Sequence, residues 1–157
     1  MVCGWFTDHE KAANIIAQAD LHVQPVSISV TLNPVSDALL GRANERLKAN
    51  PNRSKDNDVT RRRWLFIDLD PSRPEGISST DAEKQAAWEM ALQVKNYLIG
   101  QGWPEPVISD SGNGYHLLFR IDLPNDDSSL DLIDACLKAL AHLFFADKVS
   151  IDTKVSN

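Results

Sequence analysis

Apolar and polar positions along the chain follow two kinds of spacing, which predict strands and helices. The clearest strand is the apolar run 64–71, which turn-forming residues follow at once. Further strands are predicted at 26–32, 107–110, 115–121 and 149–152, and helices at 7–20, 36–48, 80–100 and 127–146. A hairpin flanked by strand–helix units indicates an α+β fold, with a mixed or antiparallel sheet and helices on one face.

Short local signals mark where several of these elements begin or turn. Thr-x-x-Glu capping boxes at 7–10 and 80–83 open two of the predicted helices. Asn113-Gly114, between two apolar runs, is a specific signal for a tight hairpin. The segment 50–60 is polar and charged, and we expect it to be a mobile loop.

Length and composition fit one ordinary domain. The chain has 157 residues, 43% of them hydrophobic and 24% charged, which is enough for a sizeable core. It shows no apolar run long enough to span a membrane and no signal-peptide pattern. Its two cysteines lack metal-binding spacing, which favours a reducing compartment. We therefore expect a single domain, residues 1–157, in the cytoplasm.

Two carboxylates interrupt the apolar strand at 64–71. Asp68 and Asp70 are two positions apart, so in a strand they point to the same face, with Cα atoms roughly 6.5 Å apart. Adjacent acids repel each other and are costly to bury unless a cation lies between them. Hard oxygen ligands suit Mg²⁺ and Mn²⁺. The alternative is a strand that ends at the surface with both acids solvated.

Strand parity brings two further polar residues to the face that carries these acids. In the strand 115–121, the more apolar set of alternate residues should meet the helices, so His116 faces the open side. In the last strand Ile151 should pack inward, which turns Asp152 outward. Asp68, Asp70, His116 and Asp152 are therefore predicted to share the open face of one sheet.

The chemistry of this set suggests its roles. Three carboxylates can hold two divalent ions about 3.5–4 Å apart, the spacing used in phosphoryl transfer. The glycine-rich turn Ser111-Gly112-Asn113-Gly114 offers backbone N–H groups to a phosphate, and His116 can donate to a phosphate oxygen. Taken singly, His116 also fits a structural histidine, Asp152 a surface acid and the turn a plain reversal. Their convergence favours a catalytic site.

Three consecutive arginines, Arg61, Arg62 and Arg63, lead into the carboxylate strand. We expect them to form a patch that contacts phosphate or template beside the acids, with a solvated strand edge as the alternative. The net charge of −6 argues against a protein that coats nucleic acid by charge alone, although a local basic groove is compatible with it.

Three segments in order carry a resemblance to a known family. Ile-Asp-Leu-Asp at 67–70, Ser-Gly-Asn-Gly-Tyr-His at 111–116 and Ile-Asp at 151–152 are similar to the three motifs of the archaeo-eukaryotic primase superfamily. The chain most resembles the primase-polymerase domains of plasmids, phages and other mobile elements. The surrounding segments 30–35, 62–71 and 102–106 fit as well, so the resemblance covers nearly the whole chain.

The resemblance implies a DNA primase and polymerase of DNA replication. Such an enzyme is a template-dependent nucleotidyltransferase that joins NTP or dNTP to a 3′-hydroxyl on a DNA template and primer. By resemblance, Asp68, Asp70 and Asp152 would be the ligands of two Mg²⁺ or Mn²⁺ ions, and His116 with Ser111 would contact the incoming nucleotide. The implied fold is an RRM-like palm, residues 61–157, beside an N-terminal α/β module, residues 1–60. A helicase or another replication protein is an expected partner.

The sequence departs from the family after its third motif. Family members continue with basic residues and further strands that help to bind the nucleotide, whereas this chain ends at Asn157. We therefore expect a palm that is incomplete at its C-terminus, with weak or absent activity in this chain and Asp152 in a frayed segment. An exposed sheet edge in such a palm would favour a homodimer.

Two alternatives to the polymerase stay open. One is a non-catalytic nucleic-acid-binding module that kept a primase palm fold. This alternative is disfavoured because an RRM-type sheet that binds single strands shows aromatic residues for base stacking, whereas the open face here offers acids, with Phe66 as the only aromatic residue clearly placed there. The other is a phosphohydrolase with an acidic strand end, which is disfavoured because Pro71 follows Asp70 and no lysine or threonine motif of that chemistry follows.

Overall fold

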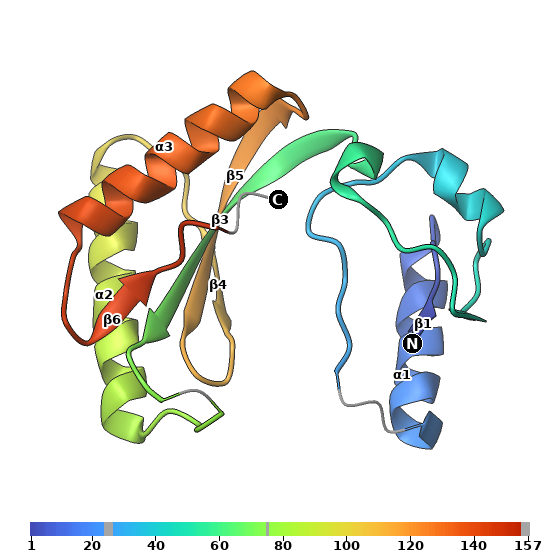
Figure 1. Ribbon diagram of the computed structural model, residues 1–157, viewed down its shortest axis with the longest axis horizontal. Helices are drawn as coiled ribbons and strands as arrows, with labels where there is room; N and C mark the ends of the chain where they lie inside the picture. Colours follow the sequence, from blue (N-terminus) through green and yellow to red (C-terminus); the bar gives the residue numbers. More distant parts are fainter. Residues whose placement is uncertain (24–26, 75, 155–157) are drawn as a thin grey trace. The chain divides into compact units, whose positions relative to one another are not determined.

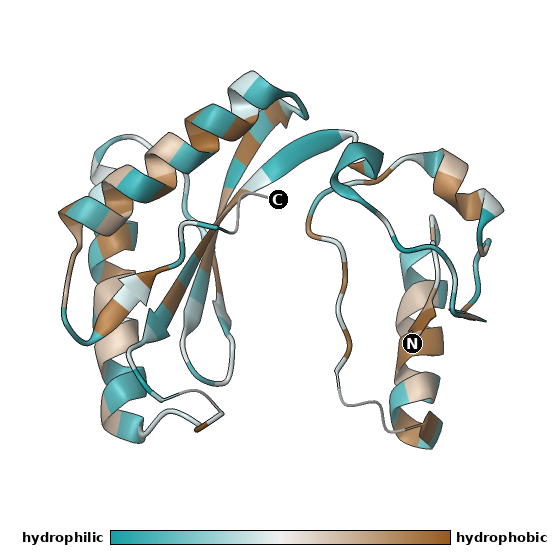
Figure 2. Ribbon diagram, in the orientation of Figure 1, coloured by the Kyte–Doolittle hydropathy of each residue, from teal (hydrophilic) through white to brown (hydrophobic). Residues whose placement is uncertain are grey.

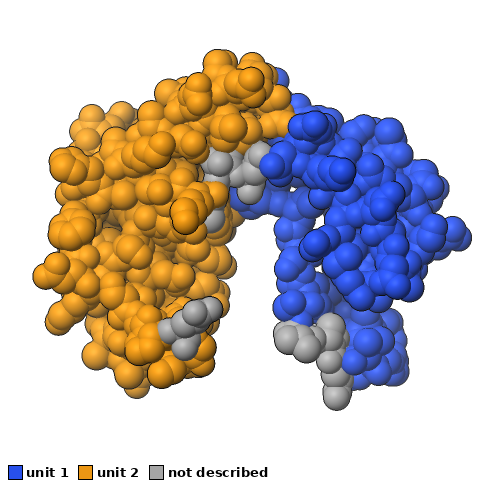
Figure 3. All heavy atoms as spheres, viewed as in Figure 1, with its two compact units in different colours: residues 1–61 blue, residues 62–157 orange. Residues whose placement is uncertain are grey.

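The chain folds into two compact units, which Figure 3 colours separately in the computed structural model. Unit 1 is Met1–Arg61 and unit 2 is Arg62–Asn157. The structure describes residues 1–23, 27–74 and 76–154. Helices and antiparallel strands occur in both units, so the fold is α+β, as the sequence predicted. Within the described residues, no helix is long and apolar enough to cross a membrane.

Unit 2 is built on a four-stranded sheet. Its strands are β3 (Arg61–Pro71), β4 (Val107–Asp110), β5 (Tyr115–Pro124) and β6 (Val149–Ile151), in the order β4-β5-β3-β6. The helix α2 (Asp81–Gly100) connects β3 to β4, and α3 (Asp127–Leu143) connects β5 to β6. Unit 2 therefore has the chain order β-α-β-β-α-β (Figure 1).

Neighbouring strands of this sheet run antiparallel. β4 pairs with β5 and β6 pairs with β3 in antiparallel registers, with Leu69 opposite Ile151. Between β3 and β5, Gly114 lies against Leu69, and the Arg120 guanidinium donates to the carbonyl oxygen of Arg63 at 3.5 Å. The end of β3 thus lies beside the start of β5, and the start of β3 lies beside the end of β5. The hairpin predicted at Asn113-Gly114 is confirmed.

The core of unit 2 lies between one face of the sheet and the helices α2 and α3 (Figure 1). Alternate residues of β3 and β5 point into it, and Figure 2 shows the matching change between apolar and polar positions along β3. Its buried side chains are Leu65, Ile67, Leu69, Ala87, Met90, Ala91, Val94, Leu98, Leu117, Phe119, Ile133, Leu137, Leu140, Val149 and Ile151. Among the described residues of unit 2, both helices cover the same face of the sheet, as predicted.

Both helices of unit 2 begin at side-chain caps. Oγ1 of Thr80 accepts the backbone N–H of Glu83 at 3.3 Å, and the Glu83 carboxylate accepts the N–H of Thr80 at 2.8 Å, which confirms the predicted capping box. Asp126 caps α3 by accepting the N–H of Ser129 at 2.8 Å. α3 ends at Leu143, three residues before the predicted end.

Unit 1 has less regular structure and a smaller core. It contains the helix α1 (His9–Val23) and a two-stranded antiparallel sheet of β1 (Val2–Cys3) and β2 (Lys48–Ala49). Two short 3₁₀ helices, η1 (Asp37–Gly41) and η2 (Asp56–Asp58), complete it. Its core consists of the buried residues Trp5, Leu39 and Ala43.

The helix predicted at 36–48 is wrong. Only η1 forms there, and the chain then turns into β2. Glu45 has a φ of +50°, which a continuous helix does not allow. Its backbone N–H donates to the carbonyl oxygen of Trp5 at 3.0 Å, so the small core of unit 1 outweighs the helical spacing of the leucines.

The strand predicted at 26–32 is also wrong over residues 27–32, where the described chain has no strand pairing. Val26 lies outside the described residues. Val30 is 78% exposed. An apolar–polar alternation stabilises a strand only when a partner strand takes up its backbone hydrogen bonds, and this segment has none among the described residues.

The helix predicted at 7–20 is present as α1, but its cap differs from the predicted box. The N–H of Lys11 donates to the Asp8 carboxylate at 3.0 Å, so Asp8 takes the cap. Thr7 instead donates from its N–H and from its hydroxyl to Oε1 of Glu45, both at 2.7 Å. Thr7, which the sequence pattern assigned to the helix cap, therefore binds the Glu45 side chain outside the helix instead.

Candidate metal and nucleotide site

Asp68 and Asp70 lie on the face of β3 opposite the core. Leu65, Ile67 and Leu69 are fully buried against the helices, so the alternate residues point to the open face of the sheet. The Asp68 side chain is 19% exposed and that of Asp70 is 47% exposed. Asp68 is thus largely buried on this face, and Asp70 is closer to solvent.

His116 of β5 lies beside Asp68 on this face. Nε2 of His116 is 3.3 Å from Oδ1 of Asp68, and the His116 ring contacts the Phe66 ring with centroids 4.7 Å apart. The Arg120 guanidinium lies over the Trp64 ring, 5.2 Å from its centroid. These contacts fit one antiparallel register. Arg120 comes four residues after His116 in β5, and its neighbour Trp64 comes four residues before Asp68 in β3. The predicted position of His116 is therefore found.

Asp152 lies on the other side of Asp68. The register of β3 with β6, continued by one pair, puts Asp152 opposite Asp68, and the N–H of Asp152 donates to the carbonyl oxygen of Asp68 at 3.0 Å. Directly opposite residues in an antiparallel pair point to the same face. The Asp152 carboxylate accepts the backbone N–H of Lys154 at 2.8 Å. Three strands therefore bring His116, Asp68 and Asp152 into one row.

The electrostatics of this row make the ionised form of Asp68 unfavourable. Burial raises the pKa of Asp68 above its usual range, and the negative charge of Asp70 raises it further. A protonated His116 opposes these effects, while Asp152 adds to them. Oδ1 of Asp68 is buried and has no hydrogen-bond partner in the structure, because the nearby His116 nitrogen lies at ion-pair distance without hydrogen-bond geometry. Such a site favours binding of a cation.

The turn Ser111-Gly112-Asn113-Gly114 comes next to Asp70 but satisfies most of its own backbone groups. The N–H of Gly112 donates to Asp110 at 2.7 Å, and the N–H of Gly114 donates to Oγ of Ser111 at 2.8 Å. The N–H of Ser111 donates to the carbonyl oxygen of Gly114 at 3.1 Å. Three of the four N–H groups expected to hold a phosphate are therefore already used within the loop and its flanking residue.

Gly114 is required for a close approach of backbones. A Cβ at this position would overlap the carbonyl oxygen of Leu69 and would lie 3.1 Å from Oδ1 of Asp70. Gly112 has a φ of +92°, which side chains rarely adopt. The side chain of Asn113 accepts the N–H of Ser79 at 3.1 Å and so joins the turn to the segment before α2. The turn thus packs directly against Leu69 and Asp70.

Hard oxygen donors suit a divalent cation at this face. Asp68, Asp70 and Asp152 supply only carboxylate oxygens, and a buried carboxylate oxygen without a hydrogen bond is an acceptor that a cation would satisfy. In residues 1–23, 27–74 and 76–154, however, no three His, Cys, Asp or Glu side chains already form a metal-holding group. The residue types fit the ion, and the carboxylates would have to turn toward it.

The three arginines at the start of β3 do not form one exposed patch. Arg63 is exposed and Arg61 is half-buried, but Arg62 is only 3% exposed. The charge of Arg62 helps to lower the pKa of Asp126, so Arg62 lies near the start of α3. Arg62 is therefore buried and does not contribute to an exposed basic patch.

Two residues near the acids were missed by reasoning from the sequence. Trp64 lies on the open face with Phe66, and the alternation along β3 contained the signal for it. Arg73, in the loop after β3, has its Nη2 3.9 Å from Oδ1 of Asp70. Loop geometry determines where Arg73 lies, so the sequence offered no comparable signal.

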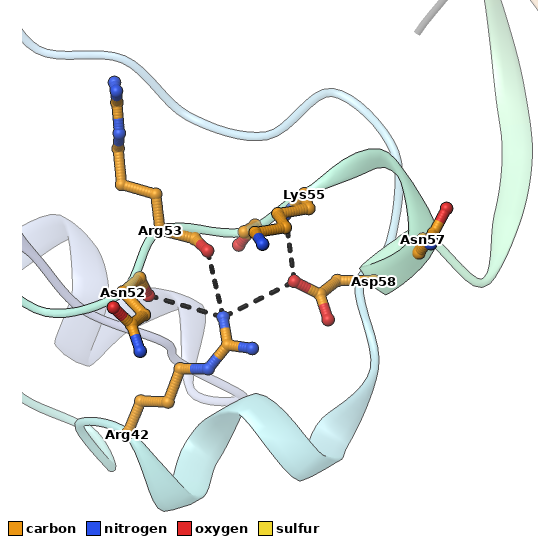
Figure 4. A pocket seen from close by; sticks show the side chains of 7 residues that line it. Arg42, Asn52, Arg53, Lys55, Asn57 and Asp58 are labelled. Carbon is orange, nitrogen blue, oxygen red and sulfur yellow. Dashed lines mark hydrogen bonds and ion pairs between the residues drawn. The ribbon is translucent and has the colours of Figure 1, made fainter.

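A pocket in unit 1 is a separate feature (Figure 4). It is lined by Arg42, Asn52, Arg53, Ser54, Lys55, Asn57 and Asp58. Nη1 of Arg42 donates to the carbonyl oxygens of Asn52 and Arg53 and to the Asp58 carboxylate, at 3.3, 3.0 and 3.4 Å. The Arg42 guanidinium at the centre of the pocket is already bound by the loop that lines it, which indicates a structural role.

Comparison with known proteins finds no matching family model, no matching curated protein and no matching solved structure.

Proposed function

We propose that the chain is a metal-dependent nucleotidyltransferase of the primase-polymerase type, which extends a primer on a DNA template. The observation that carries the proposal is the row His116, Asp68 and Asp152 across three strands of one open sheet face. Asp70 and Gly114 adjoin this row. A carboxylate group with a histidine and a glycine turn on a bare sheet suits a nucleoside triphosphate with its divalent ions.

The RRM-like palm proposed for unit 2 is supported by its topology. The chain order β-α-β-β-α-β and the sheet order β4-β5-β3-β6 are those of a split β-α-β arrangement, in which each helix crosses over one intervening strand. This topology places the middle of β3 and the start of β5 side by side at the centre of the open face. Asp68, Asp70 and His116 come from these two strands, and Asp152 follows β6.

Asp68, Asp70 and Asp152 would hold two Mg²⁺ or Mn²⁺ ions. When bound, these ions supply charge stabilisation for the triphosphate and a lower pKa for the 3′-hydroxyl. In the transfer, the 3′-oxygen bonds to the α-phosphorus, the bond from that phosphorus to the bridging oxygen breaks, and pyrophosphate leaves. The proton of the hydroxyl passes to solvent.

His116 and the turn 111–114 would position the triphosphate. In this structure Nε2 of His116 faces Asp68, and once the negative charge of Asp68 is neutralised, this nitrogen can donate to a phosphate oxygen instead. Because most of the N–H groups in the turn are used, we assign the turn the role of a closely packed backbone wall beside Asp70.

A non-catalytic module that binds single strands is the second candidate. It is favoured by one observation: Trp64 and Phe66 both lie on the open face, where the sequence had indicated Phe66 alone. Aromatic rings on a bare sheet stack with bases. Arg120 over Trp64 adds a cation to the same surface.

A primer-extension assay with Mn²⁺ separates the two candidates. We expect the chain to add nucleotides weakly to a primed DNA template, and Asp68→Asn and Asp70→Asn each to abolish this addition. Asp131→Asn, an exposed acid on α3, is the matched control and should leave addition unchanged. If no nucleotide is added and Asp68→Asn leaves binding of DNA and of Mn²⁺ unaltered, the binding module is the better description.

A further inference from the structure

We propose that Arg73 binds the terminal phosphates of the incoming nucleoside triphosphate. This inference rests on the proposed nucleotidyltransferase function and adds a phosphate-binding residue that lies in none of the three motifs. The residue follows Asp70 by three positions, in the loop between β3 and α2.

The guanidinium of Arg73 is held by two neutral acceptors of its own loop. Nε donates to Oγ of Ser79 at 3.1 Å, and Nη1 donates to the carbonyl oxygen of Ile77 at 3.3 Å. The side chain is only 19% exposed. These bonds fix the plane of the guanidinium and leave Nη2 as the nitrogen that faces outward from the loop.

Nη2 of Arg73 points toward the proposed phosphate space. It lies 3.9 Å from Oδ1 of Asp70, which is within ion-pair distance but too long for a hydrogen bond. Gly114 lies beside the same Asp70 oxygen, since a Cβ on Gly114 would be 3.1 Å from it. Asn113 binds the N–H of Ser79, so the turn and the loop of Arg73 are joined directly. Arg73, Asp70 and the turn thus surround one location.

The bonds to Ser79 and Ile77 hold the guanidinium in an orientation in which Nη2 faces the Asp70 carboxylate. A guanidinium beside a metal-binding carboxylate loses that partner when cations neutralise the carboxylate. Its two Nη2 donors then suit the oxygens of a phosphate group next to the cations, because guanidinium and phosphate form strong charge-assisted hydrogen bonds.

Calorimetric titration of the full chain with the α,β-methylene analogues of ATP and dATP, in Mn²⁺, tests the inference. We expect Arg73→Gln to weaken analogue binding about 10- to 100-fold, the range for loss of a charge-assisted hydrogen bond. Binding of AMP and dAMP should change less than about twofold, because these lack the terminal phosphates. Arg73→Lys should fall between, since it keeps the charge and loses the fork.

Three further variants make the outcome decisive. Arg46→Gln, an exposed arginine of unit 1, should bind the analogues as the unaltered chain does. Ser79→Ala removes the Nε contact and keeps the guanidinium, so it should cost less than Arg73→Gln. Equal weakening of triphosphate and monophosphate binding by Arg73→Gln would show a loop-ordering role only and overturn the inference. If Asp70→Asn abolishes analogue binding while Arg73→Gln leaves it unchanged, the inference fails and the proposed function stands. Absence of analogue binding by the unaltered chain would overturn both.

Discussion

Nε2 of His116 lies 3.3 Å from Oδ1 of Asp68, and this contact joins β5 to β3 on the open face of unit 2. The carboxylate carries an elevated pKa because it is largely buried and lies near Asp70 and Asp152. A protonated His116 lowers that pKa and is therefore the group that helps Asp68 to ionise. The site combines a carboxylate that resists ionisation with a neighbouring cation that promotes it.

Replacing His116 should shift the pH dependence of Mn²⁺ binding. In His116→Gln the pKa of Asp68 should rise further, so Mn²⁺ binding, which needs the ionised carboxylate, should begin at a higher pH than in the unaltered chain. Titration of Mn²⁺ affinity against pH measures the shift. His142→Gln, an exposed histidine on α3, is the control. An unchanged or lower midpoint in His116→Gln would refute the coupling.

Asp68 should also lower the stability of the metal-free protein. Its pKa is raised in the folded state, so the folded state holds the proton more tightly than the unfolded chain does. The stability that this provides is present below the pKa of the unfolded chain and is lost as pH rises through the folded pKa. Asp68→Asn should therefore unfold at a higher urea concentration than the unaltered chain at neutral pH, and this difference should shrink in acid. Mn²⁺ should stabilise the unaltered chain and not the variant. Greater stability of the unaltered metal-free chain at neutral pH would contradict this prediction.

Gly114 should tolerate no side chain. Gly114→Ala places a Cβ against the carbonyl oxygen of Leu69, in backbone that cannot move away easily, and should cost about 1–3 kcal/mol of the free energy of unfolding. Gly100→Ala is the matched control, because a Cβ there meets nothing within 4 Å. Urea denaturation compares the two variants. Equal stability of both would show that β3 and β5 lie further apart at this point than described.

The secondary structure of unit 2 was predicted well because its long strands and helices bury many apolar residues. β3, β5, α2 and α3 each bury several apolar residues in one core, so their periodicity reports the face that packs. The positions of Asp68, Asp70, His116 and Asp152 followed from that parity. Arg62 followed the same alternation with the open-face residues and is nevertheless buried, because periodicity along one strand does not report which other segments cover a side chain.

Unit 1 was predicted less well, since few of its residues pack into a core. Its apolar contacts centre on Trp5, Leu39 and Ala43, which are separated along the chain. The segment 27–32 has strand-like spacing of apolar residues and 36–48 has helix-like spacing. Among the described residues, neither segment forms the predicted element. A local sequence pattern decides the secondary structure only where its intrinsic propensity is strong. In 36–48 the tertiary contacts prevail, because only the short η1 forms and Glu45 has a positive φ.

Asp110 should give stability that acid removes. Its carboxylate accepts a hydrogen bond from Nζ of Lys84 at 2.8 Å and one from the N–H of Gly112 at 2.7 Å, and both lower its pKa. The folded state therefore holds the proton less tightly, so the stabilisation is present above the unfolded pKa and is lost as pH falls through the folded pKa. Asp110→Asn should lower the urea midpoint at neutral pH and converge with the unaltered chain in acid. A constant difference at every pH would contradict the assigned cause.

Paramagnetic broadening by Mn²⁺ in the NMR spectrum of the chain tests the cation site on the open face most directly. We predict that substoichiometric Mn²⁺ broadens the amide resonances of 68–70, 114–116 and 150–152 first, and that a variant carrying both Asp68→Asn and Asp70→Asn loses this effect. Asp131→Asn should keep the pattern of the unaltered chain. Broadening centred elsewhere, or an identical pattern in the double variant, would contradict a cation site formed by Asp68, Asp70 and Asp152.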